Sequence, residues 1–293
     1  MRNKKIRIGT IGNPSGLFRA TFTQTELNRF DIESDVVIVA RAGVEPLESA
    51  SEAVEYLVQA MEDSLLRGEI DVAVYAMENL SGRIPEGLAI TAVSVREDPS
   101  DRLLIRRDAY DSREIFKIKK GGIVGNATAR QQAQLTDYRP DIPFTDQGND
   151  GESCLTRLQS GDIDAVFLSA TAYNQLAQPV QDVEIVVLNP REFVPAPAQG
   201  VTAWQTNRHD TATRQLFRAL HRTEVSVCTN IERRVLQLLE GHGYHPAVYC
   251  ERDGNGNFHA FAACDMHGVL QRAHISSSTS IGVAEKIVKI LLG

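Results

Sequence analysis

The sequence predicts an α/β protein of three domains, in which two similar halves precede a small α+β domain. Short apolar runs of strand character alternate with segments of helical periodicity, which is typical of sheets whose strands are joined by helices. The motif GEIDVAV at residues 68–74 is matched by GDIDAVFL at residues 161–168. The 293 residues, of which 42% are hydrophobic and 24% charged, suffice for two or three compact domains. Two similar halves imply a cleft between them.

The first half is expected to form a parallel sheet in the order β-α-β-α-β. Its predicted elements are a strand at residues 4–10, a helix at 17–30, a strand buried on both faces at 36–40 and a helix at 46–67. The next strand is apolar and ends at Met77, Glu78 and Asn79. Ligands of α/β domains bind just beyond the carboxyl ends of strands, so Asn79 is predicted to face the functional site.

The second half repeats this order after a predicted hinge at residues 96–101. Its expected elements are strands at 102–106, 121–125 and 161–168 and a helix at 126–135. Residues 192–206 indicate a return of the chain into the first domain. The predicted boundaries are 1–97 with 190–214 for domain 1, 101–189 for domain 2 and 218–293 for the C-terminal domain.

The C-terminal segment is predicted to be a small helix-plus-sheet domain. Residues 214–239 have the apolar spacing of one long amphipathic helical region. A loop at residues 240–246 follows, then a hairpin turned by DGNGN at 253–257. A final helix at residues 280–292 closes the domain.

Charge and composition exclude several classes of protein. The net charge of −7 and the scattered lysines and arginines argue against nucleic-acid binding. No apolar run is long enough to span a bilayer, so no membrane partner is expected. Four cysteines without a CxxC pair fit reduced thiols, which indicates a cytoplasmic protein. The oligomeric state is left open by the sequence.

Four motifs carry a resemblance to a known family: REDPSD at 96–101, GNATARQQAQL at 125–135, GDIDAV at 161–166 and PAPAQG at 195–200. In their order and spacing the chain resembles porphobilinogen deaminase, also called hydroxymethylbilane synthase, over nearly its whole length. The resemblance implies two domains of the type-II periplasmic-binding-protein kind around a cleft. It also implies a third domain that carries a covalent dipyrromethane cofactor.

Family members polymerise porphobilinogen head to tail into a linear tetrapyrrole, and the resemblance implies which groups that reaction uses. A thiol anchors the growing chain, a carboxylate moves protons at the reacting pyrrole, and arginines hold the acetate and propionate groups. The family's catalytic corner is Met-Lys-Asp, where this chain has Met77-Glu78-Asn79. An amide is neither acid nor base near neutral pH. Glu78 could substitute, although adjacent side chains at a strand end point in opposite directions.

The cofactor-attachment position also differs from the family. The anchoring cysteine belongs to a Glu-Gly-Gly-Cys loop, and the resemblance places Gly243 at the thiol position, so no thioether is expected. Arg130 survives among the carboxylate-binding arginines, while several others are replaced. The replaced positions are Ile11, Gln131, Gln147, Ser153 and Gln175. Each lost charge-assisted contact weakens the binding of a carboxylate-bearing ligand by roughly 1.5–3 kcal/mol.

Each candidate ligand-binding residue has a structural alternative. Asn126 and Thr128 are placed to cap a helix, and with Arg130 the same helix end could bind a carboxylate or phosphate. Arg19 adds a cation to the rim of the expected cleft, or is a solvated helix residue. Glu78 and Asn79 are also compatible with plain surface positions.

A group of metal-ligand residue types lies near the altered loop. It comprises His242, His245, Cys250, Cys264 and His267, and the predicted hairpin brings Cys264 roughly opposite His245. These residue types bind zinc, but the spacing matches no compact zinc signature. Core packing is the favoured interpretation, and no metal is expected.

The leading hypothesis is a divergent family member of the tetrapyrrole pathway that has lost polymerising activity. It is expected to bind a small anionic, pyrrole-like ligand without a cofactor. The alternative is an active transferase, a hydroxymethylbilane synthase of haem and porphyrin biosynthesis that converts four porphobilinogens and retains dipyrromethane.

Overall fold

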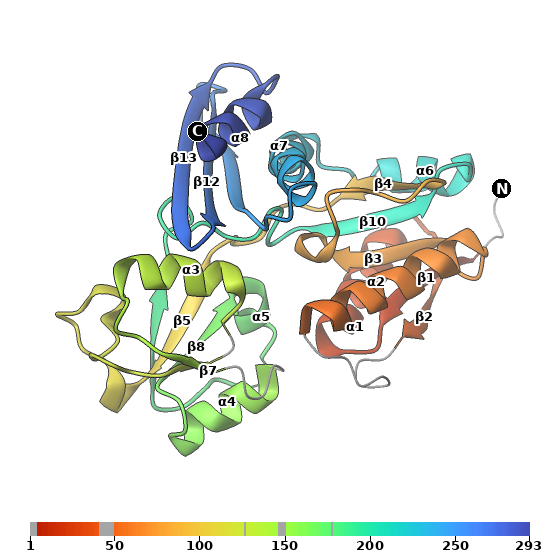
Figure 1. Cartoon of the computed structure of the whole chain (residues 1–293). Helices are drawn as coiled ribbons and strands as arrows, with labels where there is room; N and C mark the ends of the chain where they lie inside the picture. The colour runs from red at the N-terminus through yellow and green to blue at the C-terminus, as the bar shows by residue number, and fades with distance from the viewer. Residues whose placement is uncertain (1–4, 41–49, 126, 146–150, 177) are drawn as a thin grey trace. The chain divides into compact units, whose positions relative to one another are not determined.

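The computed structural model describes residues 5–40, 50–125, 127–145, 151–176 and 178–293 (Figure 1). The chain divides into two compact units. The first consists of Met1–Glu97 and Gly200–Val227, and the second of Asp98–Gln199 and Cys228–Gly293. The first boundary falls inside the hinge predicted at residues 96–101. The C-terminal segment has its own sheet but is grouped with the second unit.

The first unit contains a five-stranded sheet in the order β2-β1-β3-β10-β4. Its elements are β1 (Ile6–Ile11), α1 (Pro14–Asn28), β2 (Ser34–Ala40), α2 (Ala50–Leu66), β3 (Val72–Ala76), β4 (Leu88–Val93) and β10 (Thr202–Asn207). Strand β1 pairs in parallel with β2 and β3, which confirms the predicted parallel order. Strand β10 runs antiparallel between β3 and β4, so the chain does return into this unit.

Strand β2 corrects the prediction of a strand buried on both faces. None of its residues is fully buried, and Asp35 and Ile38 are exposed. The reason is its position, because β2 pairs with β1 alone and forms the edge of the sheet. The centre of the core lies under the middle strands, where Trp204 stacks against Phe22 and its Nε1 donates to Thr23 Oγ1 at 2.8 Å.

The second unit has a sheet of the same design, in the order β7-β6-β8-β5-β9. Its elements are β5 (Asp101–Arg106), β6 (Val124–Gly125), α3 (Ala129–Tyr138), β7 (Phe144–Thr145), α4 (Gly151–Ser160), β8 (Ala165–Ser169), α5 (Ala170–Asn174) and β9 (Val183–Val187). Strand β6 is parallel to β7 and β8, and β5 is antiparallel to β8 and β9. One antiparallel strand inserted into a parallel sheet in both units is the expected type-II arrangement.

The C-terminal elements form a three-stranded antiparallel sheet in the order β11-β12-β13, with helices packed on it. They are α7 (Thr223–Glu240), β11 (Ala247–Arg252), β12 (Phe258–Met266), β13 (Val269–Ser277) and α8 (Val283–Leu292). The helix α6 (Thr211–Arg218) belongs to the first unit, where it packs on β4 and β10. The hairpin predicted at residues 253–257 is confirmed. Asp253 Oδ1 accepts the backbone N–H groups of Asn255 and Asn257 and closes the turn.

The long helical region predicted at residues 214–239 is confirmed as helical, but it consists of two separate helices, α6 and α7. Leu220 N–H donates to Phe217 O and His221 N–H to Arg218 O, which ends α6 in a tight turn. Arg222 N–H then donates to Val93 O on β4 at 3.0 Å. This N–H is therefore used by the sheet and cannot continue the helix.

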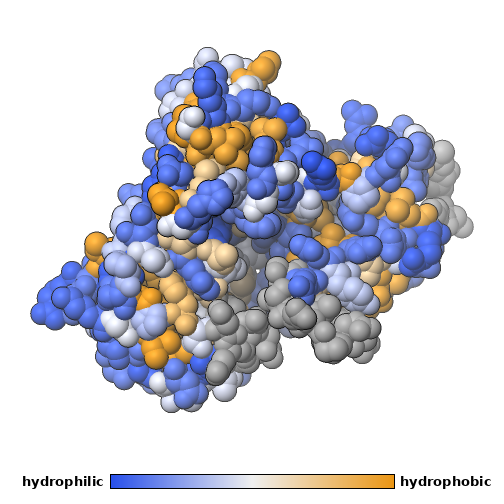
Figure 2. Space-filling model, viewed as in Figure 1, coloured by the Kyte–Doolittle hydropathy of each residue, from blue (hydrophilic) through white to orange (hydrophobic). Residues whose placement is uncertain are grey.

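None of the helices in the described part of the chain is both long and apolar enough to cross a membrane. Hydrophilic side chains predominate on the face shown in Figure 2, and the apolar ones there lie in separate patches.

Candidate functional site

The corner after β3 forms a single 3₁₀ turn, Met77–Asn79. Met77 is buried, and its N–H donates to Val201 O on the neighbouring segment at 2.8 Å. Glu78 is half-buried and Asn79 is exposed. Because the three residues turn by about 120° each instead of alternating as in a strand, Glu78 and Asn79 do not point in opposite directions as the sequence suggested.

Glu78 is the titratable group of this corner. Its Oε2 is buried and has no hydrogen-bond partner in the described part of the chain. Burial raises the pKa of Glu78, and the positive charges of Arg19 and Arg96 oppose that rise. The corner therefore has one carboxyl group whose pKa is raised by burial, next to an amide that cannot titrate.

Arg19 is buried in α1 with 5% of its surface exposed, so the interpretation as a solvated helix residue is wrong. Its Nη1 donates to Ser15 O at 3.2 Å and also contacts Ser15 Oγ. The guanidinium is held against its own helix while its charge acts on Glu78.

The start of α3 is a capping box. Thr128 Oγ1 accepts the N–H of Gln131, and Gln131 Oε1 accepts the N–H of Thr128 at 2.9 Å. The predicted capping role of Thr128 is confirmed, whereas Asn126 lies outside the described residues. Gln131, at a position where the family has an arginine, is buried and occupied by this cap.

Arg130 lies one turn into α3 and is engaged inside the protein. Its Nη1 is 2.8 Å from Asp101 Oδ2 and also donates to Val194 O at 2.8 Å. Asp101 is buried, with a side-chain exposure of 1%. Much of the charge of Arg130 is therefore balanced before any ligand binds. This pair was not predicted from the sequence, because Asp101 belongs to a different element, β5.

The PAPAQG motif is held by two buried side chains, its own Gln199, for which the sequence indicated a structural role, and Glu232, which sequence reasoning missed. Gln199 Nε2 donates to Asp101 Oδ1 at 3.1 Å and to Pro99 O at 2.9 Å. Glu232 on α7 accepts the N–H groups of Ala198 at 2.5 Å and Cys250 at 2.7 Å. These contacts give the motif a structural role within the second unit.

Gly243 and Arg130 line the same cavity, which has a volume of about 340 Å³ and lies between α3 and the C-terminal sheet. Gln134, Tyr244, His245 and His267 also line it. We call this space the Gly243 cavity. Gly243 is exposed with φ +79°, and a Cβ built there would meet no atom within 4 Å. The cavity therefore brings together the surviving arginine and the predicted cofactor-attachment position.

Comparison with known proteins identifies the family. The family model described as "Porphobilinogen deaminase, dipyromethane cofactor binding domain" matches residues 6–215. The chain belongs to the porphobilinogen deaminase family.

Two relatives in the family show how far the similarity extends. The porphobilinogen deaminase of Chloroherpeton thalassium is 30% identical over 261 residues, which cover 87% of this chain and 81% of that protein. The porphobilinogen deaminase of Chlorobium luteolum is 27% identical over 98% of this chain and 88% of that protein. Among solved structures, the VFT2 domain of Bordetella pertussis BvgS is 14% identical, with TM-score 0.45 over 80% of this chain and 92% of that one. The prediction of a tetrapyrrole-pathway family is confirmed.

The residues present do not fit the covalent attachment of the family's dipyrromethane at position 243. A thioether needs a sulfur, and Gly243 has no side chain. The four cysteines of the chain are all buried: Cys154, Cys228, Cys250 and Cys264. Cys264 lies on β12 between the cavity-lining residues Ala263 and Asp265, and burial raises the pKa of its thiol to about 11, which suppresses the nucleophilic thiolate.

The histidines and cysteines near this loop, His245 excepted, have other partners or are buried. His242 Nδ1 is 3.0 Å from Leu238 O, and His267 Nε2 is 2.9 Å from Tyr244 Oη. Cys264 is buried in β12, where its Sγ contacts Asp265 O, and His245 is exposed. A search of the described residues finds no group of three His, Cys, Asp or Glu side chains that could hold a metal ion.

Proposed function

We propose that this member of the porphobilinogen deaminase family does not extend oligopyrroles and instead binds one small anionic, pyrrole-like ligand noncovalently. The observation that carries the proposal is the Gly243 cavity, where Arg130 lies beside a position that has lost its sulfur. A growing chain without a covalent anchor would be released between additions. Asn79 has an exposed amide in place of the carboxylate that the family chemistry requires, so this second group is also absent.

The size of the Gly243 cavity favours a small ligand. Its volume of about 340 Å³ lies at the lower end of the range of roughly 300–1,000 Å³ for small-molecule sites. A single pyrrole with its acid side chains is of this order, whereas a hexapyrrole is not. Tyr244, held edge-on to His267 at 5.8 Å between ring centroids, offers an aromatic surface for a flat ring.

The charge of the cavity favours a ligand with few carboxylates. Asp101 already pairs with Arg130, so a carboxylate entering here shares that guanidinium with a buried acid. Gln134 is also occupied, because it exchanges two hydrogen bonds with the backbone of Val194. His245 is exposed and has no hydrogen bond to a residue of the described ranges, which leaves it available for a ligand.

Binding and turnover of porphobilinogen test the two parts of the proposal separately. Isothermal titration of the purified full chain is expected to give one site, weakened several-fold in H245A. The matched control is H209A, an exposed histidine outside the cavity. No uroporphyrin is expected after incubation and oxidation, and the intact mass is expected to equal the sequence mass. Sustained turnover, or a protein that already carries a dipyrromethane detected with Ehrlich's reagent, would overturn the loss of activity.

Restoring the missing sulfur sharpens the same test. The G243C side chain would enter open space, although the left-handed backbone is expected to cost roughly 1–2 kcal/mol. The native protein has four buried cysteines and is expected to react slowly with Ellman's reagent, whereas G243C gains one rapidly reacting thiol. A porphobilinogen-dependent mass increase in G243C but not in the native chain would support the proposal.

A further inference from the structure

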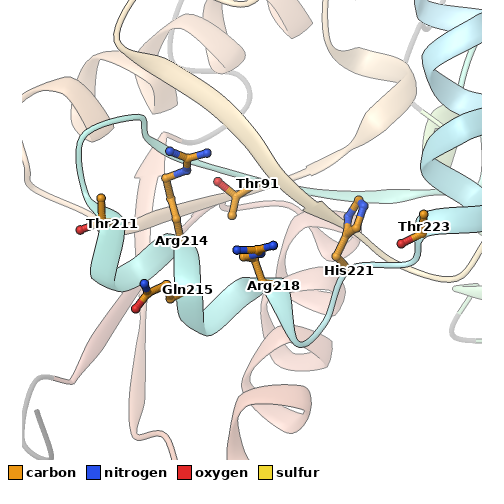
Figure 3. Close-up of a pocket in the computed structure, with 7 residues that line it drawn as sticks. All are labelled: Thr91, Thr211, Arg214, Gln215, Arg218, His221 and Thr223. Carbon is orange, nitrogen blue, oxygen red and sulfur yellow. The ribbon is translucent and has the colours of Figure 1, made fainter.

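A second cavity, with a volume of about 630 Å³, lies on the first unit between α6 and β4. We call it the α6 pocket. Figure 3 shows Arg214, Arg218 and His221 in a row along α6 and the turn that follows it, with Thr91 of β4 beside them. None of its lining residues lines the Gly243 cavity, which belongs to the second unit.

The α6 pocket is positively charged. Arg214 and Arg218 are four residues apart on α6, so their like charges repel each other along one helix face. No carboxylate is among the described residues that line the pocket. The nearest acid along the chain, Asp210, is occupied as the helix cap and accepts Thr213 N–H at 3.0 Å and Thr213 Oγ1 at 2.7 Å.

Arg218 has no balancing partner. Its side chain is exposed at the C-terminal end of α6 and makes no hydrogen bond or ion pair with any residue in the described ranges. Burial lowers the pKa of His221, and the positive charge of Arg218 lowers it further. The field of Arg218 therefore reaches into the pocket without being neutralised there.

Two inner nitrogens of the α6 pocket also lack hydrogen-bond partners among the described residues. Arg214 Nη1 donates to Arg208 O at 3.0 Å, which fixes the side chain, but its Nε is buried and has no hydrogen-bond partner in the described part of the chain. The same is true of His221 Nδ1. A buried donor without an acceptor is unfavourable, and a ligand rich in oxygen atoms would satisfy it.

Hydroxyl groups complete the lining. Thr91 Oγ1 is hydrogen-bonded to Thr206 Oγ1 at 2.7 Å, which fixes its position on β4, and Thr211 and Thr223 lie at the two ends of the pocket. The guanidinium group of arginine, with its paired N–H donors, and hydroxyl groups are typical binding partners of phosphate and carboxylate oxygens.

We propose that the α6 pocket binds a small, multiply charged oxyanion, held by Arg214 and Arg218 and oriented by His221 and Thr91. The volume matches a ligand of a few charged groups, because small-molecule sites span roughly 300–1,000 Å³. The ligand oxygens accept from the two guanidinium groups and remove the repulsion between them. This site is independent of pyrrole binding in the Gly243 cavity.

Titration of the full chain with inorganic pyrophosphate and, separately, with citrate tests the proposal at constant ionic strength. Saturable binding is expected for at least one probe, and R214Q and R218Q are each expected to weaken it about tenfold or more. The matched control is R83Q, which removes the charge of an exposed arginine of the same unit outside the pocket. Binding of pyrophosphate alone would identify a phosphate-bearing ligand, and binding of citrate alone a polycarboxylate.

Two outcomes would overturn the proposal: no saturable binding of either probe, or equal weakening in R83Q, which would indicate unspecific charge attraction. If R214Q fails to fold because the bond to Arg208 O is lost, R218Q carries the test, since the Arg218 side chain makes no hydrogen bond or ion pair within the described residues. Porphobilinogen binding is expected to be unchanged in R218Q. A failure of this site is therefore distinguishable from a failure of the Gly243 cavity.

Discussion

The two halves of the molecule use the same residues to build their sheets and different residues where those sheets end. In each unit a glycine in the left-handed region precedes the third of the parallel strands, called here the third strand: Gly68 at φ +69° before β3 and Gly161 at φ +89° before β8. An aspartate follows three residues later in both. Asp71 Oδ2 accepts the N–H of Arg7, and Asp164 Oδ2 accepts the N–H of Ile123, both at 2.9 Å. The same carboxylate contact therefore joins the third strand to the start of the neighbouring strand twice.

A second repeated contact involves the isoleucine that precedes each of these aspartates, Ile70 and Ile163. A Cβ on Gly9 would lie 2.2 Å from Ile70 Cδ1, and a Cβ on Gly125 would lie 2.7 Å from Ile163 Cδ1. Both glycines are needed because an isoleucine packs directly on the neighbouring strand.

At the far end of the third strand the halves diverge. In the first unit the chain forms the 3₁₀ turn Met77–Asn79 with its half-buried Glu78. In the second unit Ser169 caps α5 by accepting the N–H of Ala172 at 3.1 Å. The contacts that determine the fold lie at one end of the strand and the groups that determine the chemistry at the other. A family member can therefore lose catalytic groups while its fold stays intact.

The largest expected effect comes from breaking the repeated carboxylate contact. Asp71 pairs with Arg7 at 3.0 Å, and Asp164 pairs with Arg106 and Lys119, both at 2.9 Å. D71A and D164A each leave a backbone N–H and at least one cation without this acceptor, so each is expected to destabilise the protein by about 3 kcal/mol. Urea unfolding measures the loss.

D35A serves as the control for both aspartates, because Asp35 forms an exposed ion pair and its removal is expected to cost less than about 1 kcal/mol. A cost near that of D35A in either half would show that the two contacts are not equivalent.

Substitution of the two glycines is expected to lower the stability of the protein less than the loss of either aspartate. G9A forces Ile70 to move and is expected to cost about 1–3 kcal/mol, while G125A meets a less severe approach to Ile163 and should cost less. Ile70→Val removes Cδ1, so G9A should be better tolerated in the I70V background than in the native one. Thermal unfolding of the four proteins forms a double-mutant cycle. An additive cycle would contradict the steric explanation.

The sequence predicted those parts of the fold that depend on local pattern. The alternation of strands and helices in both units follows from apolar periodicity, and the DGNGN hairpin follows from turn chemistry. The edge position of β2 could not be predicted, since an apolar run of β-branched residues looks the same at an edge as in the centre. The break between α6 and α7 was also hidden, because it depends on the bond from Arg222 N–H to Val93 O.

The sequence predicted which residues belong to the candidate site but not which contacts they make. The sequence identified Arg130 and Gly243 separately, through the resemblance to the family, but only the folded chain places them on one cavity. The pairing of Arg130 with Asp101 was missed for the same reason, since it joins α3 to β5. The burial of Arg19 was missed because helical periodicity does not predict which polar residues are covered by other segments.

The smallest expected effect tests the corner where the halves differ. Burial raises the pKa of Glu78 above its ordinary value of 4.5, so the folded state binds this proton more tightly than the unfolded state. The stability contributed by that proton is fully present below the unfolded pKa and is lost as the pH rises through the folded pKa.

E78Q removes this titration. It is expected to stabilise the protein relative to the native chain more at pH 7 than at pH 4, by on the order of 0.5 kcal/mol. Unfolding at the two pH values measures the difference, and E86Q, on an exposed carboxylate of the same unit, is the control. A difference that is larger at pH 4 would contradict this expectation, because it would mean that the charges of Arg19 and Arg96 outweigh burial and lower the pKa of Glu78 in the folded protein.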